Sequence, residues 1–208
     1  MSTVVEQRTA ARDRRRAELL DAADRAIRRD GPDVSMEALA TEAGITKPVL
    51  YRHFGDRDGL LDALASRHAA RLTRELATAL ATEHHPRHRI RTTIATYLAF
   101  LERDPELHRF VTRTTRPSRS GEGALADALS VVRESVVGNV TRELDGAGLD
   151  PTPAATWGTG IVGMVQLVGE RWLDERDVAR DELVQRLTDL VWHGFRGIVL
   201  REAADRDA

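Results

Sequence analysis

The stretch that decides the fold of this 208-residue chain reads Val34-Ser-Met-Glu-Ala-Leu-Ala-Thr-Glu-Ala-Gly-Ile-Thr-Lys-Pro-Val-Leu-Tyr-Arg-His-Phe54. It predicts two short helices joined at Gly44, because glycine readily takes the left-handed conformation found where a helix ends. Ser35 and Thr46 stand where N-caps are expected. Pro48 is tolerated in a first helical turn, where backbone N–H groups lack partners. The stretch therefore predicts a helix-turn-helix.

Three residues meet separate requirements of such a hairpin. Ala40 is small where the two helices must cross, Gly44 makes the turn, and Leu50 points into the shared core. A hairpin of this kind places its second helix in the major groove of DNA. Lys47, the only lysine of the chain, lies in the first turn of that second helix. The alternative is a helical hairpin with no role in DNA binding.

Helical spacing of apolar residues continues on both sides of the hairpin, and strand signals are nearly absent. A first helix of about 18 residues should carry Leu20 and Ile27 and stop at Asp30-Gly31-Pro32. Asp56 should cap a long fourth helix. Beyond a loop near residues 81–88, five more helices are expected, over about 90–101, 105–111, 125–144, 154–173 and 182–200. The chain is therefore predicted to be all-α with about nine helices.

Composition limits the class of protein. The chain has no cysteine, which excludes disulfides and thiolate chemistry. It has no secretory signal at its start and no apolar run long enough to span a membrane, so we expect a cytoplasmic protein that does not bind membranes. The formal net charge is −2, and acidic and basic residues balance over residues 1–60. Any positive field for DNA must therefore come from the arrangement of the charges.

The segment Thr46-Lys-Pro-Val-Leu-Tyr-Arg-His-Phe54, followed by Gly55-Asp-Arg-Asp-Gly-Leu-Leu61, resembles the DNA-binding domain of the TetR family of bacterial transcriptional regulators. The resemblance extends from about Arg14 to Leu72; Arg57 departs from it, since the family usually has lysine there. It implies an N-terminal three-helix helix-turn-helix DNA-binding domain and a C-terminal helical ligand-binding and dimerisation domain. The expected divisions are a flexible arm over 1–13, a DNA-binding domain over 14–72 with its helix-turn-helix at 35–54, and an effector and dimerisation domain over 73–208.

The resemblance also implies roles for single residues on and beside the recognition helix. Tyr51, His53 and Arg57 would hold phosphates, and Ser35 would assist at the N-terminus of the preceding helix. Thr46, Lys47 and Val49 would face base edges. The full set of expected DNA-binding residues is Ser35, Thr46, Lys47, Val49, Tyr51, Arg52, His53 and Arg57. For the arginine run between Arg8 and Arg16, a minor-groove contact and a solvated helix start both remain open.

The last two predicted helices suggest a homodimer interface. Residues 154–168 are almost wholly apolar, so the helix must be covered on all faces, and small residues recur there every four positions. Resemblance points to the same two helices. The expected interface residues are Ala155, Thr159, Gly163, Leu183, Leu187, Leu190, Val191, Gly194 and Ile198. Burial within one monomer is the alternative.

An unidentified small-molecule effector is expected among the C-terminal helices, because aromatic and polar side chains occur there among apolar ones. Gln166 is the most pointed of these, since an amide in an apolar run must find a partner. The candidates are Tyr97, Phe100, His108, Phe110, Arg113, Trp157, Met164, Gln166 and Trp172. Each of them has an ordinary role in core or surface as its alternative.

Other patterns point to no further site. Gly158-Thr-Gly-Ile-Val-Gly163 matches a dinucleotide-binding motif, but that motif requires a preceding strand. His84, His85 and His88 flank Pro86 in a loop, which favours a solvated turn over a metal site. No catalytic motif occurs, so we expect no enzyme activity, no cofactor and no metal.

Taken together, the residues and the resemblance predict a sequence-specific DNA-binding regulator. We expect a ligand-responsive repressor that binds a palindromic double-stranded operator as a homodimer. An activator or a ligand-independent regulator of the same fold is one alternative. A helical interaction protein without DNA binding is the other.

Overall fold

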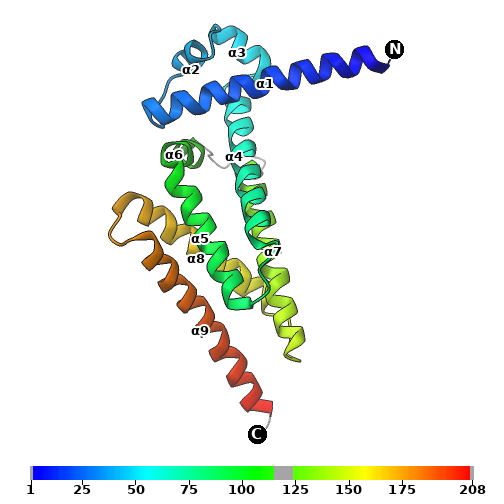
Figure 1. Cartoon of the computed structure of the whole chain (residues 1–208), viewed down its shortest axis with the longest axis vertical. Coiled ribbons are helices and arrows are strands. Elements are labelled where there is room, and N and C mark those ends of the chain that lie inside the picture. Colours follow the sequence, from blue (N-terminus) through cyan, green and yellow to red (C-terminus); the bar gives the residue numbers. More distant parts are fainter. Residues whose placement is uncertain (1, 115–123, 207–208) are drawn as a thin grey trace. The chain divides into compact units, whose positions relative to one another are not determined.

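A computed structural model describes residues 2–114 and 124–206, with the backbone alone for residues 2–5, 113–114, 124–129 and 195–206. Every regular element in this described part is a helix, as predicted (Figure 1). No described helix is both long and apolar enough to cross a membrane. The helices are α1 (Ser2–Asp30), α2 (Met36–Glu42), α3 (Lys47–Phe54), α4 (Arg57–Leu80), α5 (Pro86–Arg103), α6 (Pro105–Thr114), α7 (Ala124–Gly146), α8 (Ala154–Glu175) and α9 (Arg180–Arg206).

The chain forms two compact units. The first unit comprises Met1–Ala69 and Asp104–Ala126, and the second comprises Ala70–Arg103 and Asp127–Ala208. The division falls inside α4, close to the boundary at residue 72 that the sequence suggested. The first unit also contains α6, which the sequence analysis assigned to the C-terminal domain.

The core of the first unit joins α1 to the helix-turn-helix. Ile27 from α1, Leu39 from α2 and Leu60 from α4 are all almost completely buried in it. Phe110 brings α6 into the same core. Burial of such side chains contributes about 1.5–3 kcal/mol each, so this cluster fixes α2 and α3 against α1.

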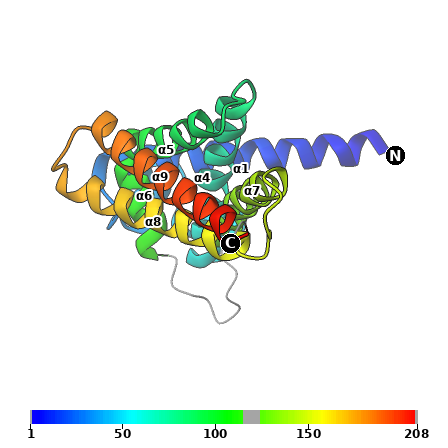
Figure 2. The ribbon, with the colours of Figure 1, turned by 90° about the horizontal axis from the view of Figure 1, so that it is seen from below.

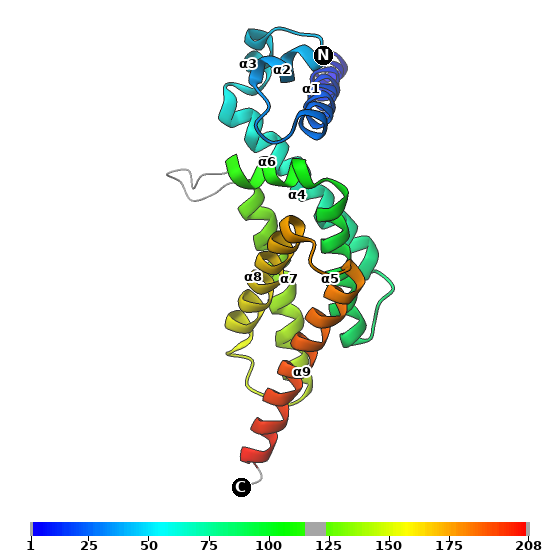
Figure 3. The ribbon, with the colours of Figure 1, turned by 90° about the vertical axis from the view of Figure 1, so that its left-hand side faces the viewer.

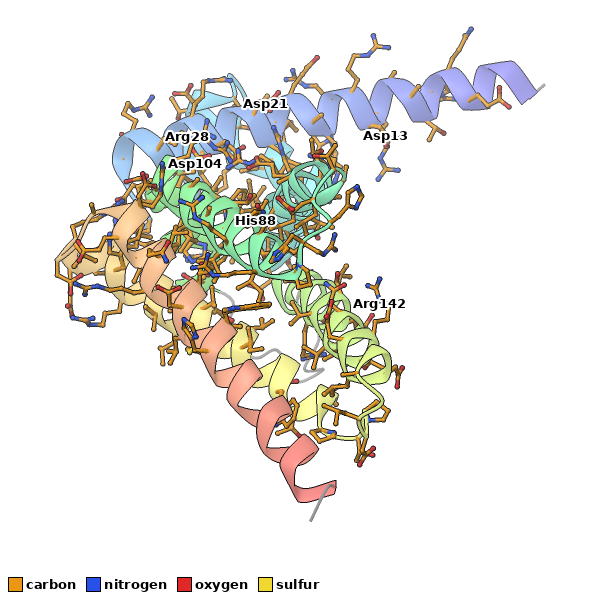
Figure 4. All side chains as sticks on the ribbon, turned by 60° about the horizontal axis from the view of Figure 1, so that its bottom comes forward. Asp13, Asp21, Arg28, His88, Asp104 and Arg142 are labelled. Atoms are coloured by element: carbon orange, nitrogen blue, oxygen red, sulfur yellow. The ribbon has the colours of Figure 1, made fainter. Side chains whose placement is uncertain are left out.

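An ion pair ties α6 to α1. The guanidinium Nε of Arg28 donates to Oδ1 of the buried Asp104 at 2.6 Å, and the two residues lie together in Figure 4. Asp104 directly precedes α6, so this bond holds the start of α6 against α1. The hydrogen bond to Asp104 raises the pKa of the Arg28 guanidinium.

The first helix is longer than predicted. It begins at Ser2 rather than near residue 13, so the segment expected to be an arm is helical. The reason is local: residues 2–29 contain neither glycine nor proline and are rich in arginine and alanine, which favour helix. Figure 1 shows the N-terminal part of α1 running beyond α2 and α3.

In the second unit, α5 packs against both α8 and α9. Figures 2 and 3 show α9 beside α5. Leu98 and Leu101 of α5 are completely buried, and they share a core with Trp172 of α8 and Val184 of α9. Three other helices of this unit thus share a core with α5, since α4 adds Leu72 to the residues of α8 and α9.

Helices α7 and α8 approach closely at Gly158. A Cβ atom at that position would lie 2.6 Å from Cγ2 of Val137 and 3.0 Å from its Cα. Gly158 is the first glycine of the dinucleotide-like motif, which lies inside α8 with no strand before it. Packing against α7 therefore explains the first glycine of the motif, whereas a Cβ atom at Gly160 or Gly163 would meet no atom within 4 Å.

Candidate nucleic-acid interface and cavity

The helix-turn-helix is built by caps and turns at the predicted residues. The Ala38 N–H donates to Ser35 Oγ at 3.1 Å, which caps α2. Gly44 has φ of 66°, and Ile45 N–H donates to Ala40 C=O at 3.0 Å to close the turn. Thr46 has the extended backbone of an N-cap, but its side chain makes no capping hydrogen bond. The turn thus depends on the glycine, because an L-residue with a side chain strains at this φ.

Helix α3 has one buried face and one accessible face. Leu50 is 1% exposed and Phe54 is 7% exposed, and both belong to the core of the first unit. The eight predicted DNA-binding residues all keep some exposure. The four exposed residues are Ser35, Thr46, Arg52 and Arg57. The four partly exposed residues are Lys47, Val49, Tyr51 and His53.

The recognition-helix lysine has an ionic partner that the sequence analysis missed. Lys47 Nζ lies 2.6 Å from Glu37 Oε1 across the turn and 5.8 Å from the centre of the Tyr51 ring. The hydrogen bond to Glu37 raises the pKa of Lys47, and the pKa of the Glu37 carboxyl is lowered in return. The two residues are ten positions apart, a separation that no helical spacing rule connects.

Arginines of α1 surround the end of α3. Arg16 Nη1 donates to the His53 C=O at 2.8 Å, and its guanidinium lies 4.4 Å from the centre of the Phe54 ring. The pKa of His53 is lowered, first by partial burial and then by the positive charges of Arg52, Arg15, Arg12 and Arg16. The first unit therefore concentrates positive charge beside α3 although the whole chain is slightly acidic.

A cavity of about 630 Å³ lies within the second unit. This volume falls in the usual range for small-molecule sites, about 300–1,000 Å³. Its walls come from α4, α5, α7, α8 and α9 and are mostly aliphatic. The aliphatic lining residues are Leu72, Leu76, Ile90, Ile94, Val132, Val136, Val140, Ile161, Val162, Val165 and Val191.

Two of the nine predicted ligand residues line this cavity, Tyr97 and Gln166. The Tyr97 hydroxyl is buried with no hydrogen-bond partner in the described part of the chain. Burial, with a smaller effect from Glu170, raises the pKa of Tyr97. Gln166 Nε2 donates to Glu170 Oε1 at 3.1 Å, so the side-chain amide has a hydrogen-bond partner within its own helix.

The other seven lie elsewhere. Phe100, Met164 and Trp172 pack in the main core of the second unit and Trp157 in its smaller cluster. Trp172 Nε1 donates to the Val178 C=O at 2.8 Å. His108 is buried next to His68, and Phe110 lies in the core of the first unit. The side chain of Arg113 lies outside the described residues.

Several polar residues that were not among the predicted ligand contacts also line the cavity. They are His84, Arg89, Thr93, Asn139, Arg142 and Glu143. In the sequence they look like ordinary surface residues of amphipathic helices. Only the packing of α5 against its neighbours brings them to one cavity.

The predicted interface residues divide into two groups. Ala155, Thr159, Gly163, Leu190 and Gly194 are exposed. Leu183 and Leu187 are buried in the core of their own second unit, where α9 packs on α5. Val191 is also buried and lines the cavity. The side chain of Ile198 lies outside the described residues.

One further apolar residue extends the exposed group. Leu167 is 70% exposed and continues the four-residue spacing of Ala155, Thr159 and Gly163 along α8. Leu190 of α9 is 59% exposed. These two side chains leave apolar area exposed on α8 and α9.

The histidine loop shows no assembled metal site. The rings of His85 and His88 lie 4.9 Å apart, and His88 Nδ1 lies 3.8 Å from Glu83 Oε1. The described residues contain no group of three or more His, Asp or Glu side chains that could hold a metal ion.

Two family models match the chain. Residues 19–64 match the model described as bacterial regulatory proteins, tetR family, and residues 75–207 match the model described as tetracyclin repressor-like, C-terminal domain. Together they cover both units. The first match contains the whole helix-turn-helix.

Similar proteins agree with these matches. The chain is 33% identical over 186 residues to an uncharacterised HTH-type transcriptional regulator of Mycobacterium tuberculosis, covering 89% of this chain and 79% of the relative. It is 27% identical over 194 residues to the HTH-type transcriptional activator FasR of Mycolicibacterium smegmatis, covering 91% and 86%. Its fold resembles that of the transcriptional regulator FadR from Bacillus subtilis in complex with stearoyl-CoA, with a TM-score of 0.68 at 16% identity, covering 84% of this chain and 96% of that one.

Proposed function

Since the chain belongs to the TetR family of DNA-binding transcriptional regulators, we propose that it is a ligand-responsive repressor that binds a palindromic operator as a homodimer. It would act in the bacterial cytoplasm, on the nucleoid when bound to DNA. The partners would be double-stranded DNA, a second copy of the chain and a small-molecule effector.

The accessible face of α3 carries this proposal. Leu50 and Phe54 anchor the helix, so its opposite side is free to enter a major groove. Lys47 stands at the leading end, where it can reach guanine O6 and N7 once its pair with Glu37 opens.

Phosphate binding would come from groups around this helix. His53 and Arg52 lie near its end, and Arg57 begins α4. Arg57 can grip a phosphate with two N–H groups. The arginines of α1 that surround His53 add positive charge at this place, which favours an approach to the DNA backbone.

A second copy of the chain would cover the exposed residues of α8 and α9. Ala155, Thr159 and Gly163 allow a close helix approach, and Leu167 and Leu190 offer apolar area. A symmetric dimer uses the same surface on both subunits. It would present two α3 helices to half-sites about 34–36 Å apart, one turn of DNA.

The effector would act by shifting a conformational equilibrium. A ligand in the cavity of the second unit lowers operator affinity if it prefers the conformation in which the two recognition helices are wrongly spaced. Helix α4 contains residues of both units and is one of the segments through which the chain passes from one unit to the other. A protein of this fold has been solved with stearoyl-CoA, which makes an acyl-type effector a natural first choice for testing.

The direct test is a gel shift with the DNA that flanks the gene of this protein. We expect binding to one site within that DNA, with an affinity that falls as salt rises, because phosphate contacts release counterions. Shuffled DNA of the same composition is the control. Absent binding would remove the repressor proposal and favour a helical interaction protein without DNA binding. Equal binding to both DNAs would remove the proposed sequence-specific recognition.

An activator of the same fold is the second candidate, because the relative FasR is named an activator. Transcription in vitro from the bound promoter separates the two. A repressor lowers transcript yield when it is added, and an activator raises it.

A further inference from the structure

The charged residues that line the cavity gather at one of its ends. The cavity runs along α5 from Pro86 to Tyr97 and along α7 from Val132 to Ala147. At about 1.5 Å per residue, these segments are roughly 17 and 22 Å long. Figures 1 and 3 show that the start of α5 and the end of α7 lie toward the same end of the second unit. The charged lining residues, Arg89, Arg142 and Glu143, all belong to that end.

Neither guanidinium at this end has a carboxylate partner in the described part of the chain. Arg89 Nη1 donates to the Glu83 C=O at 2.7 Å. Arg142 Nε donates to the Gly138 C=O at 3.1 Å, and its Nη2 donates to Asn139 Oδ1. Arg142 projects from α7 in Figure 4. Both arginines therefore bond only to neutral oxygens.

A neighbouring arginine, in contrast, has a carboxylate partner. Arg87, two residues before Arg89 on α5, forms an ion pair with Asp189 at 2.8 Å. Arg87 does not line the cavity. With two arginines and one glutamate in the lining, the charged end keeps a net positive charge.

We propose that the cavity binds a single-chain amphiphile whose anionic head, a carboxylate or a phosphate, is held by Arg89 and Arg142. Its alkyl chain lies against the aliphatic walls, where burial of each CH₂ group is favourable. Guanidinium groups match the geometry of both anions and form charge-assisted hydrogen bonds with them. The inference rests on the proposed function only in taking this cavity as the effector site.

The first test compares ligands that share one chain and differ in the head. Dodecanoate, dodecyl phosphate and dodecan-1-ol are titrated into the full chain below micelle-forming concentrations. Tryptophan fluorescence follows binding, since Trp192 lines the cavity. We expect at least one anion to bind about tenfold tighter than the alcohol, the usual scale of a charge-assisted hydrogen bond. The tighter anion identifies the head, and an alcohol that binds as tightly as both anions overturns the proposal.

The second test removes the two charges. Arg89→Gln and Arg142→Gln should each reduce the preference for the anion over the alcohol about tenfold, while the alcohol affinity stays within a factor of two or so. Arg142→Lys keeps the charge and should keep most of the preference. Glu143→Gln should increase the affinity for the anion, because it removes a negative charge from the same end.

Matched controls come from the same two helices. Arg91 on α5 and Arg133 on α7 are exposed and do not line the cavity. Arg91→Gln and Arg133→Gln should leave the preference unchanged. An equal loss in the controls, or a full preference in Arg89→Gln and Arg142→Gln, contradicts the assignment.

Operator binding is measured for each variant without amphiphile. A chain that shows the head-group preference but binds no operator would refute the proposed function and leave this inference standing. A chain that binds its operator but shows no preference among the three ligands would refute this inference and leave the proposed function standing.

Discussion

At the scale of single residues, the recognition helix shows both the reach and the limit of sequence reasoning. The burial of Leu50 followed from spacing, because a helix in a hairpin must turn its apolar residues to the core. The pairing of Lys47 with Glu37 did not follow, since it depends on how the turn places two helices. The same holds for Arg89 and Arg142, whose convergence on a cavity is a tertiary fact.

Replacing Lys47 tests its assignment to base edges. Lys47→Ala should reduce discrimination between the operator and a site with altered bases by roughly tenfold, since one good base contact contributes on this scale. Competition gel shifts measure it. Arg57→Ala is the matched comparison and should weaken all DNA evenly, with a salt slope lower by about one. Unchanged discrimination in Lys47→Ala would move base reading to other residues.

His53 should make DNA binding depend on pH. Partial burial and nearby arginines lower its pKa below the ordinary value of 6.5 in the free protein. A phosphate bound to the ring would favour the charged form and raise that pKa. The complex then binds more protons than the free protein, so affinity should rise as pH falls through the interval between the two pKa values.

Fluorescence anisotropy with labelled operator, from about pH 8 to about pH 5.5, checks this prediction. His53→Gln should flatten the profile. His193→Gln, an exposed histidine of the second unit, is the control and should keep it. An equally steep profile in His53→Gln would mean that His53 does not contact phosphate.

At the scale of helices, type and order were predictable but ends and contacts were less so. The bounds of α3 match the predicted helix from Lys47 to Phe54, because its caps are encoded by turn residues. Helix α1 runs further than predicted, because arginine and alanine continue a helix without apolar spacing. The close approach of α7 and α8 was not predicted, because Gly158 lies in a sequence that matches the dinucleotide-binding motif.

Gly158 should be essential to the packing of α7 on α8. Gly158→Ala should destabilise the chain by about 1–3 kcal/mol, because the new methyl would overlap Val137. Gly138→Ala, on α7, is the control: no atom lies within 4 Å of its added Cβ, so helix propensity alone should stabilise it by up to about 1 kcal/mol. Urea unfolding compares the two. A Gly158→Ala variant as stable as Gly138→Ala would show that α7 and α8 can separate without cost.

At the scale of the whole molecule, only some of the residues that the sequence assigned to the dimer interface are exposed in the single chain. The apolar run of α8 drew attention to Thr159 and Gly163, and both are exposed in the single chain. The predicted interface residues of α9 lie on two different faces of the helix. Leu187 is buried in the core of its own subunit, whereas Leu190 is exposed. Periodicity shows which residues share a face, but not whether that face meets the same subunit or another.

Charge on this surface should abolish the dimer. Leu167→Arg and Leu190→Arg place a guanidinium in an interface that would have to bury it, a large cost without a partner. Sedimentation velocity should show monomers, and operator affinity should fall in parallel. Val131→Arg is the control, since Val131 is 50% exposed but lies on α7. Dimers that persist in both leucine variants would place the interface elsewhere.

The solitary lysine has a practical consequence for work on this protein. Apart from the α-amino group, Lys47 is the one primary amine of the chain, and it stands on the recognition helix. Amine-reactive dyes and sensor chips would therefore capture the protein by its chain start or by the helix assigned to DNA. The pairing with Glu37, which raises the pKa of Lys47, keeps the amine protonated and slows such coupling. Biosensor measurements of operator binding should therefore immobilise the DNA, because coupling at Lys47 would neutralise the amine that pairs with Glu37.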